Sequence, residues 1–293
     1  MEGVINVYKE ASWTSGDVVN KLKGVLHQRR IGHGGTLDPD ATGVLPVLTG
    51  NATRLFDYMT AFKKTYVASV YFGKTTDTQD ASGTVLEEKE VTFLNDDLVN
   101  VLPQFIGEIM QIPPMYSALH INGQRLYDLA RKGETVELQP RKVFVENIEL
   151  VQPLKDNRCV LRITCSKGTY IRTICHDLGQ KLGSGAFMET LLREECAGLN
   201  VKNAYKISEI EEMVKNEDFS FLTPIEEAVS FIPRININSS QMKKIINGNP
   251  IKTEFADIIK QGNVAIYCDY KFFGIGEEKD GFYRFKCMLG GNK

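Results

Sequence analysis

Residues 32–46 form the segment of this sequence whose residue types could most readily do chemistry. The segment is GHGGTLDPDATGVLP, with four glycines, two prolines, two aspartates and one histidine. Glycine admits positive φ, and proline fixes φ and lacks a donor, so a shaped loop is predicted here. Asp38 precedes Pro39, which biases its backbone toward the extended region and holds its carboxylate away from any helix axis. Residue types alone favour an Asx-type turn at Asp38, and the alternative is a carboxylate presented for acid, base or nucleophilic work.

A phosphate-binding turn is a further interpretation of the same segment. Such loops carry a Lys-Ser pair or regularly spaced glycines, and residues 32–46 have neither. The segment is therefore predicted to present side chains rather than to bind phosphate through its backbone alone.

Four strings, taken in order, resemble the TruB family of tRNA pseudouridine synthases. They are GHGGTLDPDATGVLP, KKTYVASVYFGKTTDTQDASG from Lys63, QIPPMYSALHINGQRLYDLARKG from Gln111 and CSKGTYIRTICHDLG from Cys165. Together they cover most of residues 1–200. The chain departs from the family at Glu10, where proline is usual, and at Glu194, where arginine is usual.

The resemblance implies that the chain isomerises the T-arm uridine of tRNA to pseudouridine, with no cofactor and no metal. This reaction breaks the N-glycosidic bond, turns the uracil over and rejoins it through C5. By the same resemblance, Asp38 is the essential carboxylate and Tyr66 stacks on the extruded uracil, with its hydroxyl placed to serve the C5 proton. Arg172 is implied to pair with Asp38, with Tyr170 packing beside it. An arginine within about 4–6 Å would lower the pKa of Asp38 by roughly one to three units and keep it ionised.

The resemblance also implies that His33 fills the vacancy left by the flipped base and that Leu191 forms a pocket wall. Without the resemblance, a loop histidine is more often a surface or turn residue, and a strand tyrosine is more often part of the core. The apolar spacing of residues 171–182 places Arg172 off the buried face, as a surface charge. Asp80 matches a family acid, but a turn explains it equally well.

Two other functions stay open on the sequence. One is an RNA-binding or tRNA-folding protein with secondary catalysis, and the other is a paralogue that modifies another RNA. The residues Asp38, Tyr66 and Arg172 favour the enzyme. The expected partner is the T-arm of tRNA, and we expect a monomer without a protein partner.

The composition is that of an ordinary soluble globule. The chain has 293 residues, of which 42% are hydrophobic and 25% charged, enough for one large domain and a small one. No apolar run approaches the ~20 residues of a membrane span, and residues 1–5 lack a basic leader, so we expect a cytoplasmic protein. The six cysteines form no Cys-x-x-Cys pair, which predicts reduced, mostly buried thiols and neither zinc nor disulfides.

Charge is unevenly distributed along the chain. Residues 207–230 contain seven acids and one lysine, whereas residues 233–293 contain ten bases and six acids. Residues 111–142 carry five bases interleaved with Tyr116 and Tyr127, a combination suited to holding both phosphates and base faces. In the family this part resembles a mobile thumb over the T-loop. Residues 207–230 and 233–293 are equally well explained as solvated faces, and the alternative for residues 111–142 is a β-turn followed by a short helix.

The expected fold is an α+β domain around a mixed, mainly antiparallel sheet with the acidic loop in its cleft. We place a catalytic domain at 1–232, with an RNA-binding thumb at 111–142, and a small domain at 233–293 that resembles the PUA β-barrel. The boundary is predicted at residues 231–234. Strands are predicted at 4–8, 64–73, 144–150, 159–165, 264–267, 271–275 and 282–289, with 144–150 and 159–165 as neighbours.

Helices are predicted by apolar spacing in six places. They are a helix capped by Ser15 with apolar positions to residue 26, a face made by Ala52, Leu55, Phe56 and Met59, a helix at 95–105 shortened by Pro103, one at 171–182, one from 208, and a basic one at 237–248.

Overall fold

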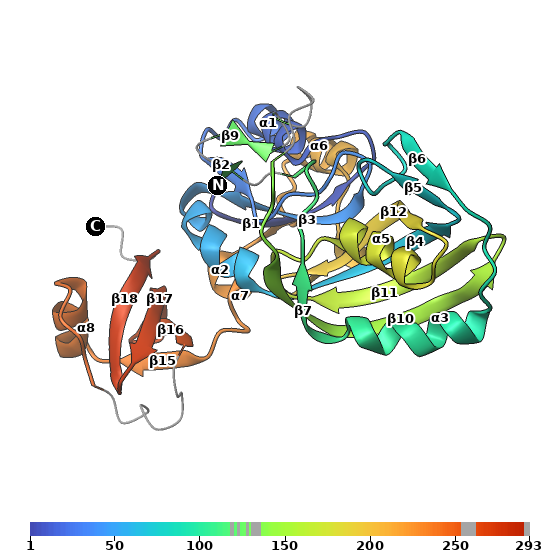
Figure 1. The fold of residues 1–293 in the computed structure, drawn as a ribbon. Helices are drawn as coiled ribbons and strands as arrows, with labels where there is room; N and C mark the ends of the chain where they lie inside the picture. The colour runs from blue at the N-terminus through green and yellow to red at the C-terminus, as the bar shows by residue number, and fades with distance from the viewer. Residues whose placement is uncertain (118–119, 122–123, 127–128, 130–135, 253–261, 290–293) are drawn as a thin grey trace.

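A computed structural model of the chain describes residues 1–117, 120–121, 124–126, 129, 136–252 and 262–289 (Figure 1). Within these residues, a ten-stranded sheet runs in the order β14-β1-β3-β12-β4-β11-β10-β7, with β13 beside β12 and β2 beside β3. All its pairs are antiparallel except β3 with β12. The predicted mixed, mainly antiparallel α+β fold is therefore confirmed. No helix of the described residues is long and apolar enough to span a membrane.

The large sheet is built from strands of very different length. Its members are β1 (Gly3–Lys9), β2 (Ile31–His33), β3 (Thr42–Thr49), β4 (Lys64–Phe72), β7 (Gly107–Gln111), β10 (Arg141–Lys155), β11 (Arg158–Cys165), β12 (Ala186–Cys196), β13 (Leu199–Asn200) and β14 (Leu222–Thr223). Two small ribbons pair β5 (Lys74–Thr76) with β6 (Val85–Glu88) and β8 (His120–Ile121) with β9 (Gln124–Arg125).

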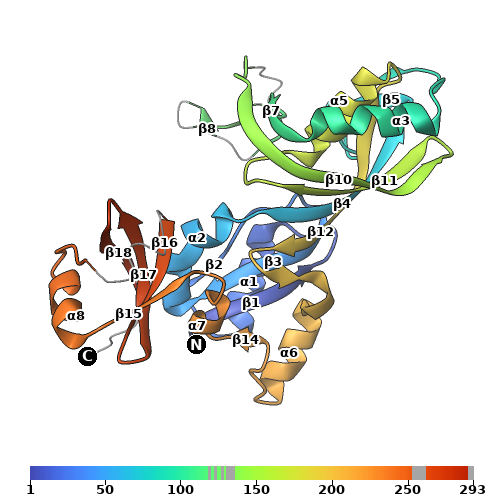
Figure 2. The same cartoon turned by 90° about the horizontal axis from the view of Figure 1, so that it is seen from below.

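The helices cover the two halves of this sheet separately (Figure 2). Apolar residues of α3 (Asn95–Val101) and α5 (Ile171–Lys181) pack on β4, β10, β11 and β12 in one core. A second core joins α1 (Ser15–Val25) and α6 (Ile207–Lys215) to β1 and β3. Shorter elements are η1 (Gly50–Leu55), α2 (Phe56–Ala61), η2 (Leu102–Phe105), η3 (Val201–Asn203) and α7 (Ile225–Ala228). A third core lies on the other face of β1 and β3, where Val4, Val44 and Leu48 pack with Met59 and Ala228, and β12 contributes residues to the first and third cores.

Local sequence explains most of these elements. The alternation in β11 buries Cys159, Leu161 and Ile163, and β10 pairs with it as predicted. Pro103 ends α3 and starts the 3₁₀ turn η2, as its missing donor requires. All six cysteines are buried, which confirms the predicted burial of these thiols.

Two local predictions were wrong in detail. The cap of α1 is Thr14 rather than Ser15, because the Thr14 hydroxyl accepts from the Asp17 amide while the Asp17 carboxylate accepts from the Thr14 amide. The predicted face at residues 52–59 is a 3₁₀ turn followed by α2, and the change of pitch leaves Phe56 45% exposed.

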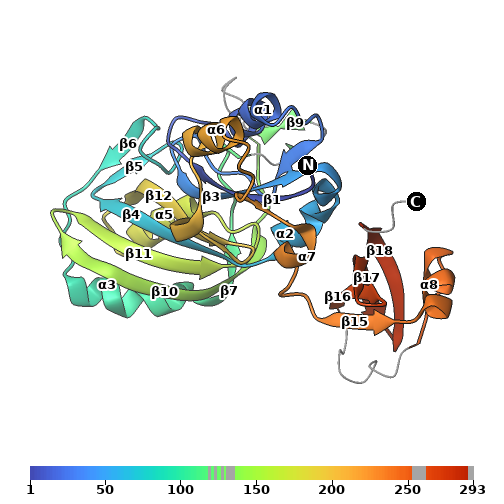
Figure 3. The ribbon, with the colours of Figure 1, turned by 180° about the vertical axis from the view of Figure 1, so that it is seen from behind.

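Residues 234–288 form a second, separate sheet. It contains β15 (Arg234–Ile237), β16 (Gly262–Cys268), β17 (Lys271–Lys279) and β18 (Phe282–Met288) in that order, with α8 (Ser239–Ile246) beside it. The described strands show this sheet but no closed barrel. The chain passes from α7 into β15 to reach it (Figure 3). The two parts are in contact, since Arg54 Nη1 donates to the Met288 carbonyl over 2.7 Å.

Candidate active site

A cavity of about 260 Å³ opens where the loop after β2 meets β4, β12 and the start of α5. Its lining consists of Gly35, Thr36, Leu37, Asp38, Thr60, Lys64, Tyr66, Ser117, residues 166–172, Leu191 and Arg193. Five of the six site residues expected from the sequence are in this set. Strands and a helix far apart in sequence therefore bring these side chains together.

The loop that carries Asp38 is held by groups outside it. Ser15 Oγ accepts from the Leu37 amide over 2.9 Å, and Lys9 Nζ donates to the Pro39 carbonyl over 2.7 Å. Among the described residues, no backbone amide donates to the Asp38 carboxylate, so the Asx-turn interpretation is wrong. The loop instead turns this carboxylate toward α5.

Arg172 meets that carboxylate from the first turn of α5. Its Nε lies 3.1 Å from Asp38 Oδ2, and its Nη2 donates to Asp38 Oδ1 over 3.3 Å. The contact expected between the two residues is therefore present. The expectation of a surface charge from apolar spacing is wrong, since the Arg172 side chain is only 6% exposed. It is buried because carboxylates and backbone carbonyls supply acceptors for its donors.

Asp80 is a second acid on the same arginine. Arg172 Nη1 lies 3.2 Å from Asp80 Oδ2 and donates to the Thr78 carbonyl over 3.2 Å. The other oxygen of Asp80 accepts from the amide and hydroxyl of Ser82, so this residue forms the predicted turn as well. The guanidinium thus bridges two carboxylates, which fixes its plane beside Asp38.

The pKa of Asp38 is raised from its ordinary value, opposite to the direction expected from Arg172 alone. Burial by the surrounding loop and helix is the largest cause, and it outweighs the attraction of Arg172, while Asp80 adds repulsion. The side chain still has 40% of its surface exposed, toward the cavity. A carboxylate that is poorly solvated and partly accessible is a stronger base and nucleophile than one free in water.

Tyr66 and Leu191 form part of the cavity lining on adjacent strands. They lie on β4 and β12 and are each 8% exposed. Burial raises the pKa of Tyr66 to about 12, so its hydroxyl is protonated at neutral pH in the free protein. An aromatic ring in a cavity of this kind gives a flat surface for a base.

Tyr170 lies at the N-terminal end of α5, beside Arg172. The buried side chain of Gln111 donates to the Tyr170 carbonyl over 3.0 Å and accepts from its amide over 2.8 Å. Gln111 ends β7, at the base of the segment predicted to be a thumb, and Arg172 Nη2 donates to the carbonyl of Tyr116 in that segment over 2.8 Å. Tyr127, Arg131 and Lys132 of the same prediction lie outside the described residues.

His33 is the one expected site residue that does not line the cavity. It lies on β2, half-buried, opposite Val47 of β3. Burial and the charge of Arg193 lower its pKa, so the imidazole is neutral at pH 7. Its Nδ1 is buried with no partner among the described residues. It therefore lies at the edge of the loop rather than against the reacting groups.

Three buried cations around the loop were not identified as site residues from the sequence. Lys9, Lys64 and Arg193 each donate to backbone carbonyls: Lys9 to those of residues 10, 13 and 39, Lys64 to those of 60 and 62, and Arg193 to those of 35, 36 and 44. Burial lowers the pKa of Lys9 to about 8. Their local sequence carries no signal, because a lysine or arginine inside a strand is ordinarily assigned to the solvated face.

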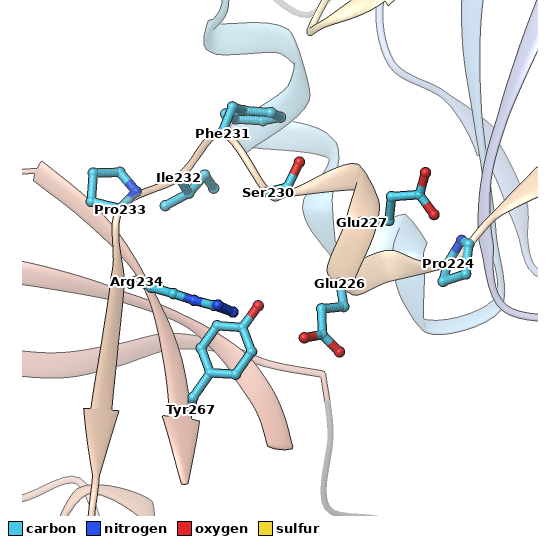
Figure 4. Close-up of a pocket in the computed structure, with 9 residues that line it drawn as sticks. All are labelled: Pro224, Glu226, Glu227, Ser230, Phe231, Ile232, Pro233, Arg234 and Tyr267. Atoms are coloured by element: carbon cyan, nitrogen blue, oxygen red, sulfur yellow. The ribbon is translucent and has the colours of Figure 1, made fainter. Parts of the chain in front are cut away.

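A larger cavity of about 640 Å³ lies at the junction of α7 and β15 (Figure 4). Arg234 lies over the Tyr267 ring, with its guanidinium carbon 4.6 Å from the ring centroid, and Glu226 stands opposite them in the close-up. The lining includes none of the residues around Asp38. Its carboxylates, Glu226 and Glu227, make it unsuited to an RNA phosphate.

The described residues hold no group of three or more histidines, cysteines and acids placed to bind a metal ion. The ionisable side chains that line the cavity are one carboxylate, two arginines, two lysines and two phenols. Such a set can attack or deprotonate a substrate, hold a flat ring and move a proton.

Comparison with known proteins identifies the family. The N-terminal domain of the TruB family pseudouridylate synthases matches residues 23–171, the tRNA pseudouridylate synthase B C-terminal domain matches 172–230, and the C-terminal domain of pseudouridine synthase II TruB matches 233–282. The tRNA pseudouridine synthase B of Streptococcus thermophilus is 42% identical over 294 residues, covering 99% of each chain. That of Streptococcus mutans is 42% identical, covering 97% of this chain and 98% of its own.

A similar fold occurs in a structure of an H/ACA RNP bound to a substrate RNA containing 2'-deoxyuridine. The TM-score is 0.73 at 23% identity, covering 99% of this chain and 85% of the other. The matched family domains and the near full-length relatives show that this chain belongs to the TruB family of pseudouridylate synthases.

Proposed function

We propose that this protein converts the T-arm uridine of tRNA to pseudouridine, with Asp38 as the reacting carboxylate. The observation that carries the proposal is the ion pair of Asp38 with the buried Arg172, in a cavity that also contains Tyr66. Relatives 42% identical over nearly the whole chain are named tRNA pseudouridine synthase B, which supports tRNA as the substrate.

The reaction requires an ionised carboxylate beside C1′ and C6 of the uridine. The N1–C1′ bond breaks, its electron pair leaves with the uracil, and the base turns so that C5 bonds to C1′. Arg172 opposes the burial that raises the pKa of Asp38 and so favours its anionic form. Tyr66 supports the detached uracil ring, and its oxygen accepts the proton from C5. The isomerisation is then complete without a cofactor.

Access to the uridine requires that it leave the T-loop stack. Unstacking costs a few kcal/mol, which binding of the flipped nucleotide must offset. We assign this binding to the cavity, to the thumb at 111–142 and to a PUA-like RNA-binding domain at 233–293. The basic content of residues 233–293 supports the last assignment, since phosphate neutralisation dominates affinity for RNA.

The test is incubation with an unmodified tRNA transcript tritiated at C5 of its uridines. Tritium release equal to one atom per tRNA, with pseudouridine mapped to the T-arm, is the expected result. A transcript in which the T-arm uridine is replaced by cytidine is the matched control and should release nothing. Binding without release from any tRNA would favour an RNA-folding protein instead, and release only from another RNA would favour the paralogue.

Substitution of His33 by alanine is expected to weaken turnover only partially. The imidazole lies on β2 outside the cavity lining, so its loss removes a group that fills the vacancy in the RNA but none that reacts. Single-turnover rates should fall by about tenfold, equivalent to about 1.4 kcal/mol. The rate should recover on a pre-opened RNA whose T-arm uridine is already unstacked. An equal loss on both RNAs would show that His33 acts on the chemistry.

A further inference from the structure

Arg193 is a buried arginine at the cavity to which the proposed reaction gives no role. It lies on β12, is 0% exposed and forms part of the cavity lining. Its Nε donates to the Val44 carbonyl over 2.7 Å, Nη1 to Thr36 over 3.3 Å and Nη2 to Gly35 over 3.1 Å. No carboxylate of the described residues lies within ion-pair distance of it.

Burying a guanidinium without a carboxylate is costly unless other acceptors replace the lost water. Here three carbonyl oxygens do so, and two of them belong to the loop that carries Asp38. The close approach of β3 to β12 makes this reach feasible, because a Cβ on Gly43 would lie 2.3 Å from the Arg193 carbonyl oxygen. Gly43 also has φ +102°, which favours glycine. The backbone is therefore shaped to bring this arginine beneath the loop.

Arg193 also lies beside Tyr66 in the sheet. Arg193 of β12 and Tyr66 of β4 are directly opposite each other in the antiparallel register, so their side chains share one face of the sheet. Both side chains line the cavity, and the charge of the guanidinium opposes the rise in the Tyr66 pKa that burial causes. Each reacting group named above thus has its own buried arginine, Arg172 for Asp38 and Arg193 for Tyr66.

We propose that Arg193 is the positioning residue for proton transfer at C5, holding the Tyr66 oxygen and the Asp38 loop in one fixed arrangement. This inference rests on the proposed function. In the step concerned, the Tyr66 hydroxyl first gives its proton to water, and the C5–H bond then breaks as its proton passes to the resulting phenolate oxygen. The electron pair forms the C5=C6 double bond, and the pair of the N1=C6 bond moves to N1, which takes a proton from water. A guanidinium next to the phenol stabilises the phenolate that accepts the proton.

A double-mutant cycle of Arg193→Lys and Tyr66→Phe tests the proposal. Lysine keeps the charge but lacks the planar, forked guanidinium that lets Arg193 donate to three separate carbonyl oxygens. Under single turnover with excess enzyme, Arg193→Lys should slow tritium release about tenfold when Tyr66 is present and less than about twofold in the Tyr66→Phe background. Deuterium at C5 should slow product formation more in Arg193→Lys than in the wild type.

Equal losses in both backgrounds, with an unchanged isotope effect, would overturn the proposal and leave Arg193 as a support of the loop. Arg193→Gln is the second variant, and thermal unfolding shows whether each chain folds. If neither variant folds, Arg193 serves the fold itself and the assignment to Tyr66 is wrong. A wild-type chain that releases no tritium from tRNA contradicts the proposed function, whereas active wild type with an additive cycle contradicts only the role of Arg193.

Discussion

Replacing Asp38 with asparagine is expected to abolish pseudouridine formation while leaving tRNA affinity nearly unchanged. Asparagine preserves the size of the side chain and removes its charge, so no anion remains beside C1′ and C6. Loss of a reacting group lowers an enzymatic rate by about 10⁴-fold or more. Single-turnover tritium release and filter binding on the same preparation measure the two quantities. Pseudouridine formed by Asp38→Asn would show that another residue acts on the uridine.

The same substitution should not lower the melting temperature at neutral pH. The pKa of Asp38 is raised in the folded chain, so the stability it contributes is fully present below its unfolded pKa and is lost as pH rises through its folded pKa. The ionised Asp38 side chain is therefore less favourable than a neutral one, and Arg172 keeps Asp80 as its carboxylate partner in this variant, so asparagine should preserve or raise the melting temperature. The acidic limb of the wild-type kcat profile should have its midpoint above the ordinary aspartate pKa.

Asp40→Asn is the matched control for both measurements. Asp40 is exposed on the same loop and is not in the cavity lining. This variant should retain the wild-type rate and show no rise in melting temperature. If both variants raised the melting temperature equally, the effect would come from the charge of the loop rather than from the burial of Asp38.

Substitution of Arg172 by methionine should impair both stability and catalysis. It leaves Asp38 and Asp80 facing each other without the cation that both contact. Removing one partner of a largely buried ion pair costs about 3 kcal/mol, which lowers Tm by about 6–12 °C in a chain of this size. The carboxylate also loses its orientation, so the rate should fall by at least about 100-fold. Thermal unfolding and single-turnover tritium release measure these changes.

Two variants separate charge from geometry in this experiment. Arg172→Lys keeps the cation but cannot bridge both acids, so it should recover stability more than rate. Arg162→Met removes another arginine with two carboxylate partners, Glu149 and Glu194, from a side chain that is 37% exposed. Exposed pairs contribute about 1 kcal/mol or less, so this control should stay active and stable. If Arg172→Met and Arg162→Met had the same melting temperature and the same rate, the Asp38–Arg172 pair would have no role in stability or catalysis.

The sequence predicted those elements whose own side chains determine them. Alternation placed β11 correctly because one face of that strand is buried, and a proline marked the end of α3. The order of strands could not be predicted, since β12 enters between β3 and β4 through contacts distant in the chain. The exposure of Phe56 was also not predicted from its apolar spacing. The 3₁₀ turn before it rotates its side chain away from the buried face that a continuous α-helix would have formed.

The site was predictable only as far as the resemblance reached. Spacing on α5 placed Arg172 at the surface, and the structure buries it because acceptors from three other segments converge on it. Asp80 was predicted to be a turn residue, and it is one. Its contact with Arg172 could not be predicted, because the neighbouring sequence contains no pattern that indicates it. The buried position of Arg193 also depends on strand pairing, which hydrophobic pattern does not encode.

Asp38 and Arg172 are 134 positions apart in the chain, and Arg193 follows later still. The ribosome therefore synthesises Asp38 long before the two arginines that we propose act with it. Premature termination between these residues leaves a polypeptide that contains residues 32–46 but lacks Arg172 and Arg193, so the proposed active site cannot form. Errors of synthesis should accordingly yield inert protein rather than an enzyme with relaxed choice of RNA.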